Sequence, residues 1–396
     1  YDSLLRLNRI THPDENFRSY TYNGNSQVLS ITDEEGQLTS YTYDANRNLA
    51  LVTYPSGQSL LFTYDGLDRP AEIRDADGNK FQRSFDSAGN LTSLTDPLGN
   101  TNLFQFSSSG KLLSATDAVG NTWRNTYDSE QVLLSLEDPS GNRVDFSSDS
   151  TGNLTSTSLP DGARSQRVRD VMGEVVTHSD GKGFITTYSF DPRGLLKGMR
   201  LPGGEQVSLS RNRLGQITSV VDPLGNLWQK TFDPAGRLAS RTDPSGNTLS
   251  FTYDSRNRTS SLSYPDQLGT VELSYDKTGN LESKSFSAGL TITYSYGLGS
   301  KLTGSDGLSL GYNNRGLITN SNGIQTDYDA AGRLQTITLE PGKTLAYVYN
   351  SRSQIASITD WTGASVQFGY GQAGELNSLT RSNGIQSILQ YNSQGQ

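Results

Sequence analysis

Carboxylates are the side chains of this chain that could most readily do chemistry, and nine aspartates recur at one place in a repeated pattern. Hard cations such as Ca²⁺ take oxygen ligands, so a row of these aspartates could form a calcium-binding ladder. Such a site would need two or three carboxylates, whereas most of the turns offer one, and we therefore favour turn capping. The nine are Asp33, Asp75, Asp96, Asp117, Asp138, Asp180, Asp222, Asp243 and Asp360.

Other catalytic constellations are not distinguishable from the repeated background. His12 and His178 are the only histidines and lie far apart in the sequence, so surface sheet positions are favoured over base or ligand roles. A Ser-His-Asp site or a carboxylate pair for glycoside hydrolysis would need a non-repeating cluster. Zero Cys excludes disulfides, thiolate zinc sites and thiol catalysis. The prediction is a protein with no enzymatic activity, catalytic residue, cofactor or metal.

Charge and hydropathy limit the kinds of molecule that the chain could bind. The chain has 33 Lys and Arg against 41 Asp and Glu, a net charge of −8, and no basic cluster that could follow a phosphate backbone. Nucleic-acid binding is therefore not expected. No apolar run approaches the roughly 18 to 20 residues of a membrane span, and no signal peptide is visible.

An aromatic residue followed by a short polar residue returns every 21 residues from Tyr1-Asp2 to Tyr253-Asp254, which indicates one supersecondary unit copied along the chain. We call this position the anchor. Ser148, Arg169 and Arg211 hold it where the pattern is most eroded, and spacings of 16 occur around 297–328. The aromatic anchors predicted to brace the structure are Tyr22, Tyr43, Tyr64, Phe85, Phe106, Tyr127, Phe190, Phe232, Tyr253, Tyr275, Tyr296, Tyr312, Tyr328, Tyr349 and Tyr370.

Each unit reads as strand, turn, strand, turn. Apolar residues alternate before the anchors, as in Leu60, Phe62 and Tyr64, and period two is typical of a strand. Asp-x-x-Gly follows the anchor, a second strand opens with Asn or Arg and then an apolar residue, and a second Asp-x-x-Gly, often with Pro, ends the unit. About 38 to 40 antiparallel strands should form one all-β meander. In the two 16-residue units, the distance from the turn glycine to the following anchor is shorter by an even number of residues. The anchor side chain should therefore stay on the same face of the sheet, and these units should form a narrow waist in the ribbon.

The repeated string YDxxGRL/NL…DPxGN, found from Tyr43-Asp44 to Arg333-Leu334, resembles the YD repeats of the Rhs family. That family includes bacterial polymorphic toxins, the B and C components of insecticidal toxin complexes, wall-associated proteins and teneurins. The resemblance covers essentially the whole chain. It implies tandem 21-residue β-hairpins forming a continuous antiparallel β-spiral ribbon, part of a hollow shell that encloses a toxin or effector domain.

The chain departs from the family pattern at one point. Members that cut off their cargo carry a terminal segment with an Asn-Pro motif, an aspartate dyad and a DPxGL ending, and we find no such segment. The nearest string, Asp191-Pro192-Arg193-Gly194-Leu195, lies within the array in the ordinary turn register. Autoproteolysis is therefore assigned to no residue.

Several expectations follow for the whole chain. Residues 1–396 are predicted to form a single repeat domain, and the anchor at Tyr1 and the new unit begun after Tyr391 suggest a piece of a longer array. Forty strands spaced about 4.8 Å apart would make an open arc or short spiral of roughly one turn, about 60 Å across. Its partner would be an enclosed polypeptide, in cis or in another chain, and its location secreted or at the bacterial cell surface.

Two roles remain open for the aromatic residues. Cross-strand Tyr and Phe ladders stabilise neighbouring hairpins, which favours a structural role for the anchors. A Tyr-rich surface could instead contact sugars, so the alternative function is an adhesion or carbohydrate-binding module at a cell surface that contacts glycans or surface proteins. Trp123, Trp228 and Trp361 are interpreted as packing residues.

Overall fold

The chain folds into one long ribbon of antiparallel strands. The computed structural model describes residues 1–265 and 268–391, and within them all regular secondary structure is β-strand. The 38 strands belong to one unclosed sheet in which each strand pairs with its neighbours along the chain. The predicted all-β meander is confirmed. The unit expected to begin after Tyr391 lies outside the described residues.

Strands of two kinds alternate. The even-numbered strands lead to the anchors: β2 (Phe17–Tyr22), β4 (Leu38–Tyr43), β6 (Ser59–Tyr64), β8 (Lys80–Phe85), β10 (Thr101–Phe106), β12 (Thr122–Tyr127), β14 (Arg143–Ser148), β16 (Arg164–Arg169), β18 (Ile185–Phe190), β20 (Gln206–Arg211), β22 (Leu227–Phe232), β24 (Thr248–Tyr253), β26 (Thr270–Tyr275), β28 (Thr291–Gly297), β30 (Leu308–Tyr312), β32 (Ile324–Tyr328), β34 (Lys343–Tyr349), β36 (Ser365–Tyr370) and β38 (Gln386–Ile388). The odd-numbered strands follow the anchor turns: β1 (Arg9–Thr11), β3 (Val28–Thr32), β5 (Leu49–Thr53), β7 (Pro70–Asp75), β9 (Leu91–Thr95), β11 (Leu112–Thr116), β13 (Leu133–Glu137), β15 (Leu154–Ser158), β17 (Val175–Ser179), β19 (Leu196–Arg200), β21 (Ile217–Val221), β23 (Leu238–Thr242), β25 (Thr259–Ser263), β27 (Leu281–Phe286), β29 (Lys301–Ser305), β31 (Ile318–Ser321), β33 (Leu334–Glu340), β35 (Ile355–Thr359) and β37 (Leu376–Arg381).

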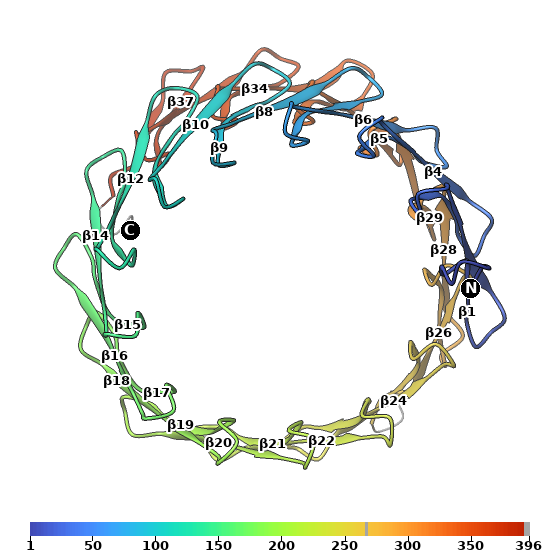
Figure 1. Cartoon of the computed structure of the whole chain (residues 1–396). Helices are drawn as coiled ribbons and strands as arrows, with labels where there is room; N and C mark the ends of the chain where they lie inside the picture. The colour runs from blue at the N-terminus through green and yellow to red at the C-terminus, as the bar shows by residue number, and fades with distance from the viewer. Residues whose placement is uncertain (266–267, 392–396) are drawn as a thin grey trace.

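A register shift occurs at the anchor of each complete hairpin. In the hairpin of β6 and β7, for example, the register changes between Thr63 and Tyr64, so Tyr64 lies opposite Pro70. An extra residue in one strand bends it and increases the local twist. Repeated along the chain, this bulge makes the ribbon curve, and the anchor turns curl towards the centre of the ring near β9, β15 and β17 (Figure 1).

Both turns of a unit close in the same way. In the anchor turn of β8 and β9, the Gly89 amide donates to the Asp86 carbonyl over 3.1 Å, and the Asp86 amide donates to the Asn90 carbonyl over 3.0 Å. Gly89 has a φ of +92°, a left-handed conformation that glycine adopts without steric cost. Arg47 occupies the same place with a φ of +73°, so the turn also forms without glycine.

The ribbon is one layer thick. The accessible surface is 23176 Å², whereas a compact monomer of this mass would expose about 15,000 Å². Among the described residues only Val52 and Val271 are buried hydrophobic side chains, and they remain 5% and 7% exposed. Stability must therefore come from hydrogen-bonded ladders and half-buried side chains on the two faces of the sheet. No helix within the described residues is long and apolar enough to cross a bilayer.

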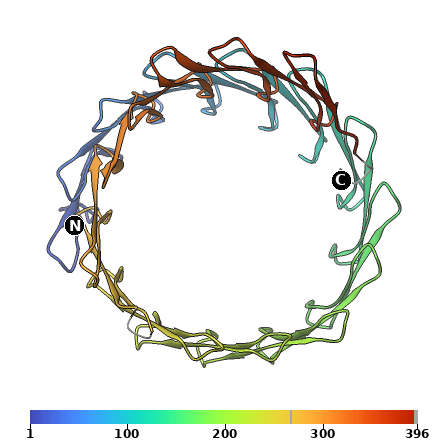
Figure 2. The same cartoon turned by 180° about the vertical axis from the view of Figure 1, so that it is seen from behind.

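The ribbon winds beyond one full turn, which differs from the expected single turn. Hydrogen bonds join residues 242 to 262 positions apart, so the last third of the 396-residue chain lies beside the first third. Figures 1 and 2 show the C-terminal strands behind or in front of the N-terminal strands around the same ring. The sequence-based estimate placed all the strands around a single turn. The bulges curve the ribbon more tightly than that estimate assumed, so the ribbon overlaps itself.

The shortened units lie in the second turn of the spiral. Ser321 pairs with Ile324 across the two-residue turn Asn322-Gly323, and Ser305 pairs with Leu308 across Asp306-Gly307. Tyr312 still lies opposite Ile318 and Tyr328 opposite Leu334, in the register of the longer units. The anchors thus keep their face while strands of four and five residues narrow the ribbon, as predicted.

Candidate functional site

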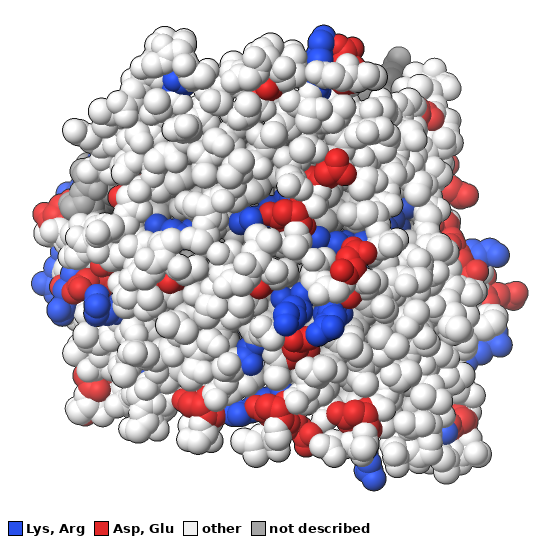
Figure 3. Space-filling view, turned by 90° about the horizontal axis from the view of Figure 1, so that it is seen from above, with Lys and Arg blue, Asp and Glu red and all other residues white. Residues whose placement is uncertain are grey.

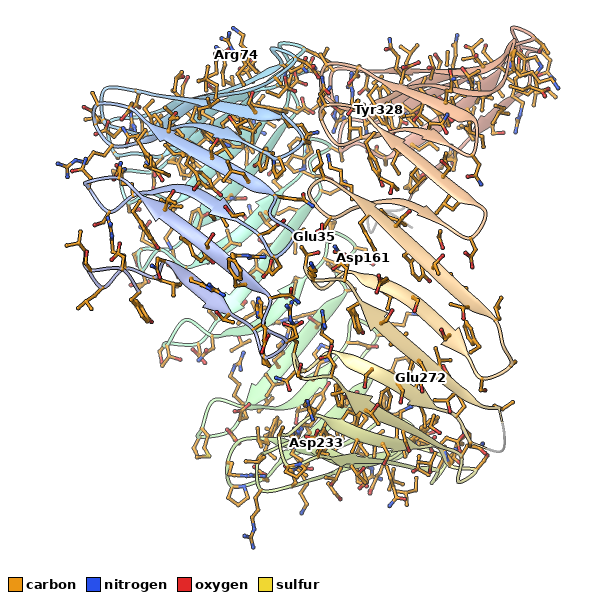
Figure 4. All side chains as sticks on the ribbon, turned by 90° about the vertical axis from the view of Figure 1, so that its right-hand side faces the viewer. Glu35, Arg74, Asp161, Asp233, Glu272 and Tyr328 are labelled. Atoms are coloured by element: carbon orange, nitrogen blue, oxygen red, sulfur yellow. The ribbon has the colours of Figure 1, made fainter. Side chains whose placement is uncertain are left out.

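The two faces of the ribbon differ in chemistry. One face carries small polar pairs, such as Thr21 with Ser30 over 2.6 Å and Thr126 with Ser135 over 2.6 Å. Arg74 belongs to this face by its pairing register and points away from the ring in Figure 4. The polar face is therefore the outer one. Figure 3 shows charges of both signs interspersed on the outer surface at the top of the ring.

The inner face carries the apolar residues. We define its central band as the residues two positions before each anchor and nine positions after it, which lie directly opposite one another in the sheet. Phe62 opposite Ile73 and Phe251 opposite Leu262 are two such pairs. Trp228, on the same face, remains 41% exposed. Most side chains of this band are half-buried against their neighbours in the same sheet, and Val52 is buried, so the inner wall offers a partly exposed apolar surface.

Anchor tyrosines tie each unit to the one before it. Their hydroxyls donate to a backbone carbonyl at the start of the second strand of the preceding unit, as from Tyr64 to Leu49 over 2.9 Å and from Tyr253 to Leu238 over 2.8 Å. The tyrosines of the predicted set that make this bond are Tyr22, Tyr43, Tyr64, Tyr127, Tyr253, Tyr275, Tyr296, Tyr312, Tyr349 and Tyr370.

The phenylalanine anchors occupy the same position without a phenol hydroxyl, and Tyr328 lies at the same register shift. Phe85, Phe106, Phe190 and Phe232 end their strands at the same register shift. Arg211, which replaces the aromatic ring, still donates through Nη2 to the Leu196 carbonyl over 3.3 Å. This is the contact that tyrosine makes elsewhere, so the connection between units survives the substitution.

A second set of contacts joins neighbouring anchor turns. Five residues after the anchor, Arg69 donates to its own Asp65 over 2.7 Å and to the backbone carbonyl of Asp86 in the next turn over 2.7 Å. Its guanidinium lies 4.8 Å from the centre of the Phe85 ring. Arg6, Arg237, Arg258 and Arg333 stack in the same way on the next anchor. Polar and stacking contacts therefore join neighbouring anchor turns at these five places along one edge of the ribbon.

Several of the aspartates that open these turns have a lowered pKa, which favours their charged form. Burial opposes ionisation of Asp254, but the amides of Arg258 and Arg256 and the Arg258 guanidinium outweigh it and lower its pKa. The hydroxyl of Thr151 and the amide of Asn153 lower the pKa of Asp149 to about 2. A carboxylate that accepts several hydrogen bonds titrates at lower pH. Its role here is to fix the turn.

We use the word seam for the line where the second turn of the spiral contacts the first. Three arginines, each three residues after an anchor, form ion pairs across it: Arg256 with Asp14 over 2.7 Å, Arg315 with Asp75 over 3.2 Å and Arg352 with Asp117 over 2.8 Å.

Several neutral contacts join the same two layers. The Gly299 amide donates to Gln37 over 2.8 Å, and Gln58 donates to the Asn313 carbonyl over 3.3 Å. Figure 4 shows the two layers meeting near Glu35. The seam thus places the anchor turns of the second layer on the opposite edge of the first.

All nine second-turn aspartates cap turns. Asp96 is typical, since its Oδ1 accepts from the Leu98 and Asn100 amides over 2.9 Å each and its Oδ2 accepts from the Asn100 amide side chain over 2.8 Å. The same Oδ1 contacts occur at Asp33, Asp75, Asp117, Asp138, Asp180, Asp222, Asp243 and Asp360. Within residues 1–265 and 268–391, no group of three potential ligands is placed to hold a metal.

The two histidines lie on different sides of the ring. His12 follows β1, and its Nε2 lies 2.8 Å from Oε1 of Glu34, whose side chain is only 3% exposed and also accepts from Arg18. Burial raises the pKa of Glu34, but the His12 and Arg18 hydrogen bonds outweigh it, and the net shift is downward. His178 lies in β17 opposite Arg167 on the inner wall. His12 is therefore part of a local ion-pair cluster and not a free surface residue.

The tryptophans are not equally packed. Trp123 lines a crevice at the seam, where the Arg352 guanidinium lies 5.7 Å from its ring. Trp361, in a second turn, is 45% exposed, and Trp228 faces the interior. Trp123 is thus packed at the seam, whereas Trp228 and Trp361 are only partly covered, Trp361 with the Lys343 Nζ 5.9 Å from the centre of its ring. A packing role for these two stays a prediction.

The seam arginines were not singled out by sequence reasoning. Arginine three residues after an anchor occurs at Arg193, Arg256, Arg315 and Arg352, a recurrence visible in the repeat alignment. Its meaning depends on the length of one spiral turn, because Arg193 in the first layer instead pairs with Asp191 of its own turn. The sequence pattern predicted that the arginines five residues after an anchor open a strand, but not that they stack on the next anchor ring.

Comparison with known proteins identifies the repeat. The family model described as teneurin YD-shell matches residues 18–167 and 283–395, and the RHS repeat model matches residues 211–248 and 232–268. A search of curated proteins returned no match.

Two solved structures share the fold. A Tc holotoxin pore of Photorhabdus luminescens aligns over 99% of this chain with a TM-score of 0.64 and 15% identity, and a TcdB2-TccC3-TEV structure aligns over 96% with a TM-score of 0.60 and 15% identity. The chain spans about a quarter of those chains, 27% and 26% respectively. At this identity the likeness shows the fold alone.

Proposed function

The chain belongs to the teneurin YD-shell family, and we propose that it forms part of a shell wall around the toxin or effector polypeptide of a secreted or contact-delivered protein. The curved one-layer ribbon with a partly exposed apolar inner face is the observation that carries this proposal. The enclosed polypeptide is supplied in cis or by another chain. The location that fits is extracellular or the bacterial cell surface.

The proposed role needs no catalysis. A wall acts by separating what it encloses from proteases and from other proteins outside. The repeated aspartates and tyrosines are committed to turn amides and backbone carbonyls, which is a structural use of the side chains. The polar outer face with both signs of charge suits contact with water, while the inner face suits contact with a loosely folded chain that exposes apolar residues.

Protease protection tests this role. A protease-sensitive reporter polypeptide fused after Gln396 should be cleaved more slowly than the same reporter alone, because the ring limits access to it. The matched control carries Arg256→Gln, Arg315→Gln and Arg352→Gln, which break the three seam ion pairs while leaving each repeat intact. Equal cleavage rates for the free reporter, the fusion and the seam variant would contradict the proposal.

A glycan array distinguishes the adhesion module from the shell. Saturable binding of the isolated chain to one glycan class, together with an unprotected reporter, would favour adhesion. Protection without glycan binding would favour the shell.

Cleavage of the reporter is best followed by gel densitometry on the intact fusion, since the wall itself must remain uncut for the comparison to hold.

A further inference from the structure

Charged residues in the central band of the inner wall are all cationic within the described part of the chain. They are Arg83, Arg167, His178, Lys230, Arg241 and Lys284, counting histidine as a potential cation. This sign is opposite to the net charge of −8 of the whole protein. The acidic residues near this face lie in the turns at its edges, where they accept hydrogen bonds from turn amides.

Two pairs of basic side chains face each other directly across neighbouring strands. Arg167 lies opposite His178, and three units further along, Lys230 lies opposite Arg241. The charges of Lys230 and Arg241 have the same sign, and like charges directly opposite in a sheet are destabilising. No salt bridge to Arg167, Lys230 or Arg241 occurs in the described residues. A local arrangement that costs stability without compensation is typical of a functional surface.

The first pair lies in a depression of the inner wall of about 480 Å³, lined also by Arg169, Tyr188 and Phe190. Within the described protein, Nη1 of Arg167 and Nε of Arg169 are buried without a hydrogen-bond partner. Unpaired buried donors are costly, and a carboxylate would satisfy them. The one acid in the lining, Glu174, is turned towards the next anchor turn, with Oε1 3.2 Å from where a Cβ on Gly194 would stand.

We propose that this depression binds an aspartate or glutamate side chain of the enclosed polypeptide, with an adjacent apolar residue of that polypeptide against Tyr188 and Phe190. The occupant is an acidic, extended segment, and charge complementarity identifies it. Arg167 and Arg169 donate to the carboxylate, and His178 adds a further donor. The inference rests on the shell function and specifies the chemistry of what the shell holds.

The second cationic pair sets the length of the recognised segment. Three units separate the two pairs, which is six strands or roughly 29 Å along the sheet at about 4.8 Å per strand. An extended peptide covers that distance in about nine residues. A segment with acidic residues about nine positions apart would therefore reach both pairs.

The test uses the full chain and a fluorescent 12-residue peptide that carries Asp-Phe near each end, compared with a peptide in which Lys replaces Asp. Fluorescence anisotropy at low ionic strength should show saturable binding of the acidic peptide alone. Arg167→Gln should weaken it about ten-fold, because one charge-assisted contact is lost. Arg167→Lys should recover part of that loss. Thermal melts of each variant confirm folding.

Arg164→Gln is the matched control. Arg164 lies in the same strand β16 but on the outer face, so the same change in charge should alter binding less than about two-fold, the size expected from screened long-range charge. Equal losses in Arg164→Gln and Arg167→Gln, or equal binding of both peptides, would overturn the inference. Displacement of the peptide by an equal concentration of free glutarate would show a small-carboxylate site and would also overturn it.

The outcome separates this inference from the shell function. Reporter protection with no peptide binding would leave the shell standing and remove the acidic occupant. Peptide binding without reporter protection would remove the shell function and leave an acidic-peptide site on this face.

Discussion

A single hydroxyl distinguishes tyrosine from phenylalanine at the anchors, and the structure gives that hydroxyl a partner. The accepting carbonyl lies at the start of a second strand, beside the bulge, where the ladder of the sheet is interrupted. A backbone carbonyl left without a donor costs free energy, so the phenol supplies what the bulge removes. The Nη2 contact of Arg211 serves the same carbonyl position.

Tyr64→Phe tests this use of the hydroxyl. The change removes the 2.9 Å bond to the Leu49 carbonyl and should lower the free energy of unfolding by about 1 kcal/mol, measured by urea denaturation. Phe85→Tyr is the reciprocal control and should leave stability unchanged or raise it. A Tyr64→Phe variant as stable as the parent would show that water satisfies the carbonyl equally well.

Acid sensitivity follows from the capped aspartates. A carboxyl whose pKa is lowered on folding stabilises the protein above its unfolded pKa of 3.8, and that contribution is lost as the pH falls towards the folded value, about 2 for Asp149. Stability should therefore decrease between about pH 4 and pH 2. Asp149→Asn keeps an acceptor for the turn amides but does not titrate, so its melting temperature should change less across this window. Parallel pH profiles for the two proteins would contradict the assignment.

Neighbouring repeats are coupled at the scale of the element by an arginine five residues after the anchor. Arg333 pairs with Asp329 over 2.7 Å, donates to Ser353 in the next anchor turn over 3.0 Å, and lies 4.5 Å from the centre of the Tyr349 ring. The contacts with Ser353 and with the Tyr349 ring connect this hairpin to the next one, while the ion pair with Asp329 fixes the guanidinium in its own turn. Such nearest-neighbour terms make a repeat array cooperative.

Arg333→Ala should lower the free energy of unfolding by about 2 kcal/mol, because a half-buried ion pair and a stacking contact are lost together. Arg333→Lys should recover only part of this loss, since an ammonium lacks the planar fork of a guanidinium. Arg74→Ala is the control, because Arg74 pairs with Glu72 on the exposed outer face and should contribute less than about 1 kcal/mol. Comparable effects at the two sites would argue against coupling through the anchor turns.

At the scale of the whole molecule, the seam joins the second turn of the curved ribbon to the first. Its three ion pairs are partly buried. In each of them, an arginine of an anchor turn in the second layer pairs with an aspartate at the opposite edge of the first layer. The contact with Arg256 lowers the pKa of Asp14, so this pair favours the charged state. We infer that residues 1–396 behave as one continuous domain, because the 38 strands of the described residues form one sheet and the seam joins its two turns.

The triple variant Arg256→Gln, Arg315→Gln and Arg352→Gln should open the ring without unfolding the repeats. Small-angle scattering should report a larger radius of gyration, because the two layers separate and the curved ribbon opens. Circular dichroism should stay unchanged. Arg193→Gln is the control, because Arg193 holds the same place in its repeat but pairs within its own turn. An unaltered radius in the triple variant would assign closure to the neutral contacts of the seam.

Strand periodicity, turn chemistry and the anchors could be predicted because they depend on residues within one unit. Alternation around Phe62 and Tyr64, Asp and Gly in the turns, and the even shortening near Tyr312 are all local signals, and the structure follows them. The resemblance to YD repeats rested on the same local strings. For this reason the sequence predicted the elements and their order well.

The tertiary structure alone decided which face lies inside, how far the ribbon winds and which residues meet across the seam. Alternation marks two faces but does not say which way the sheet bends, and winding is the sum of many small bends at the bulges. Arg352 meets Asp117 because the winding brings residues more than 200 positions apart onto neighbouring layers. Arg167 faces the interior because the sheet bends towards its face. Interactions within a unit are determined by its own residues, whereas curvature accumulates over the whole chain.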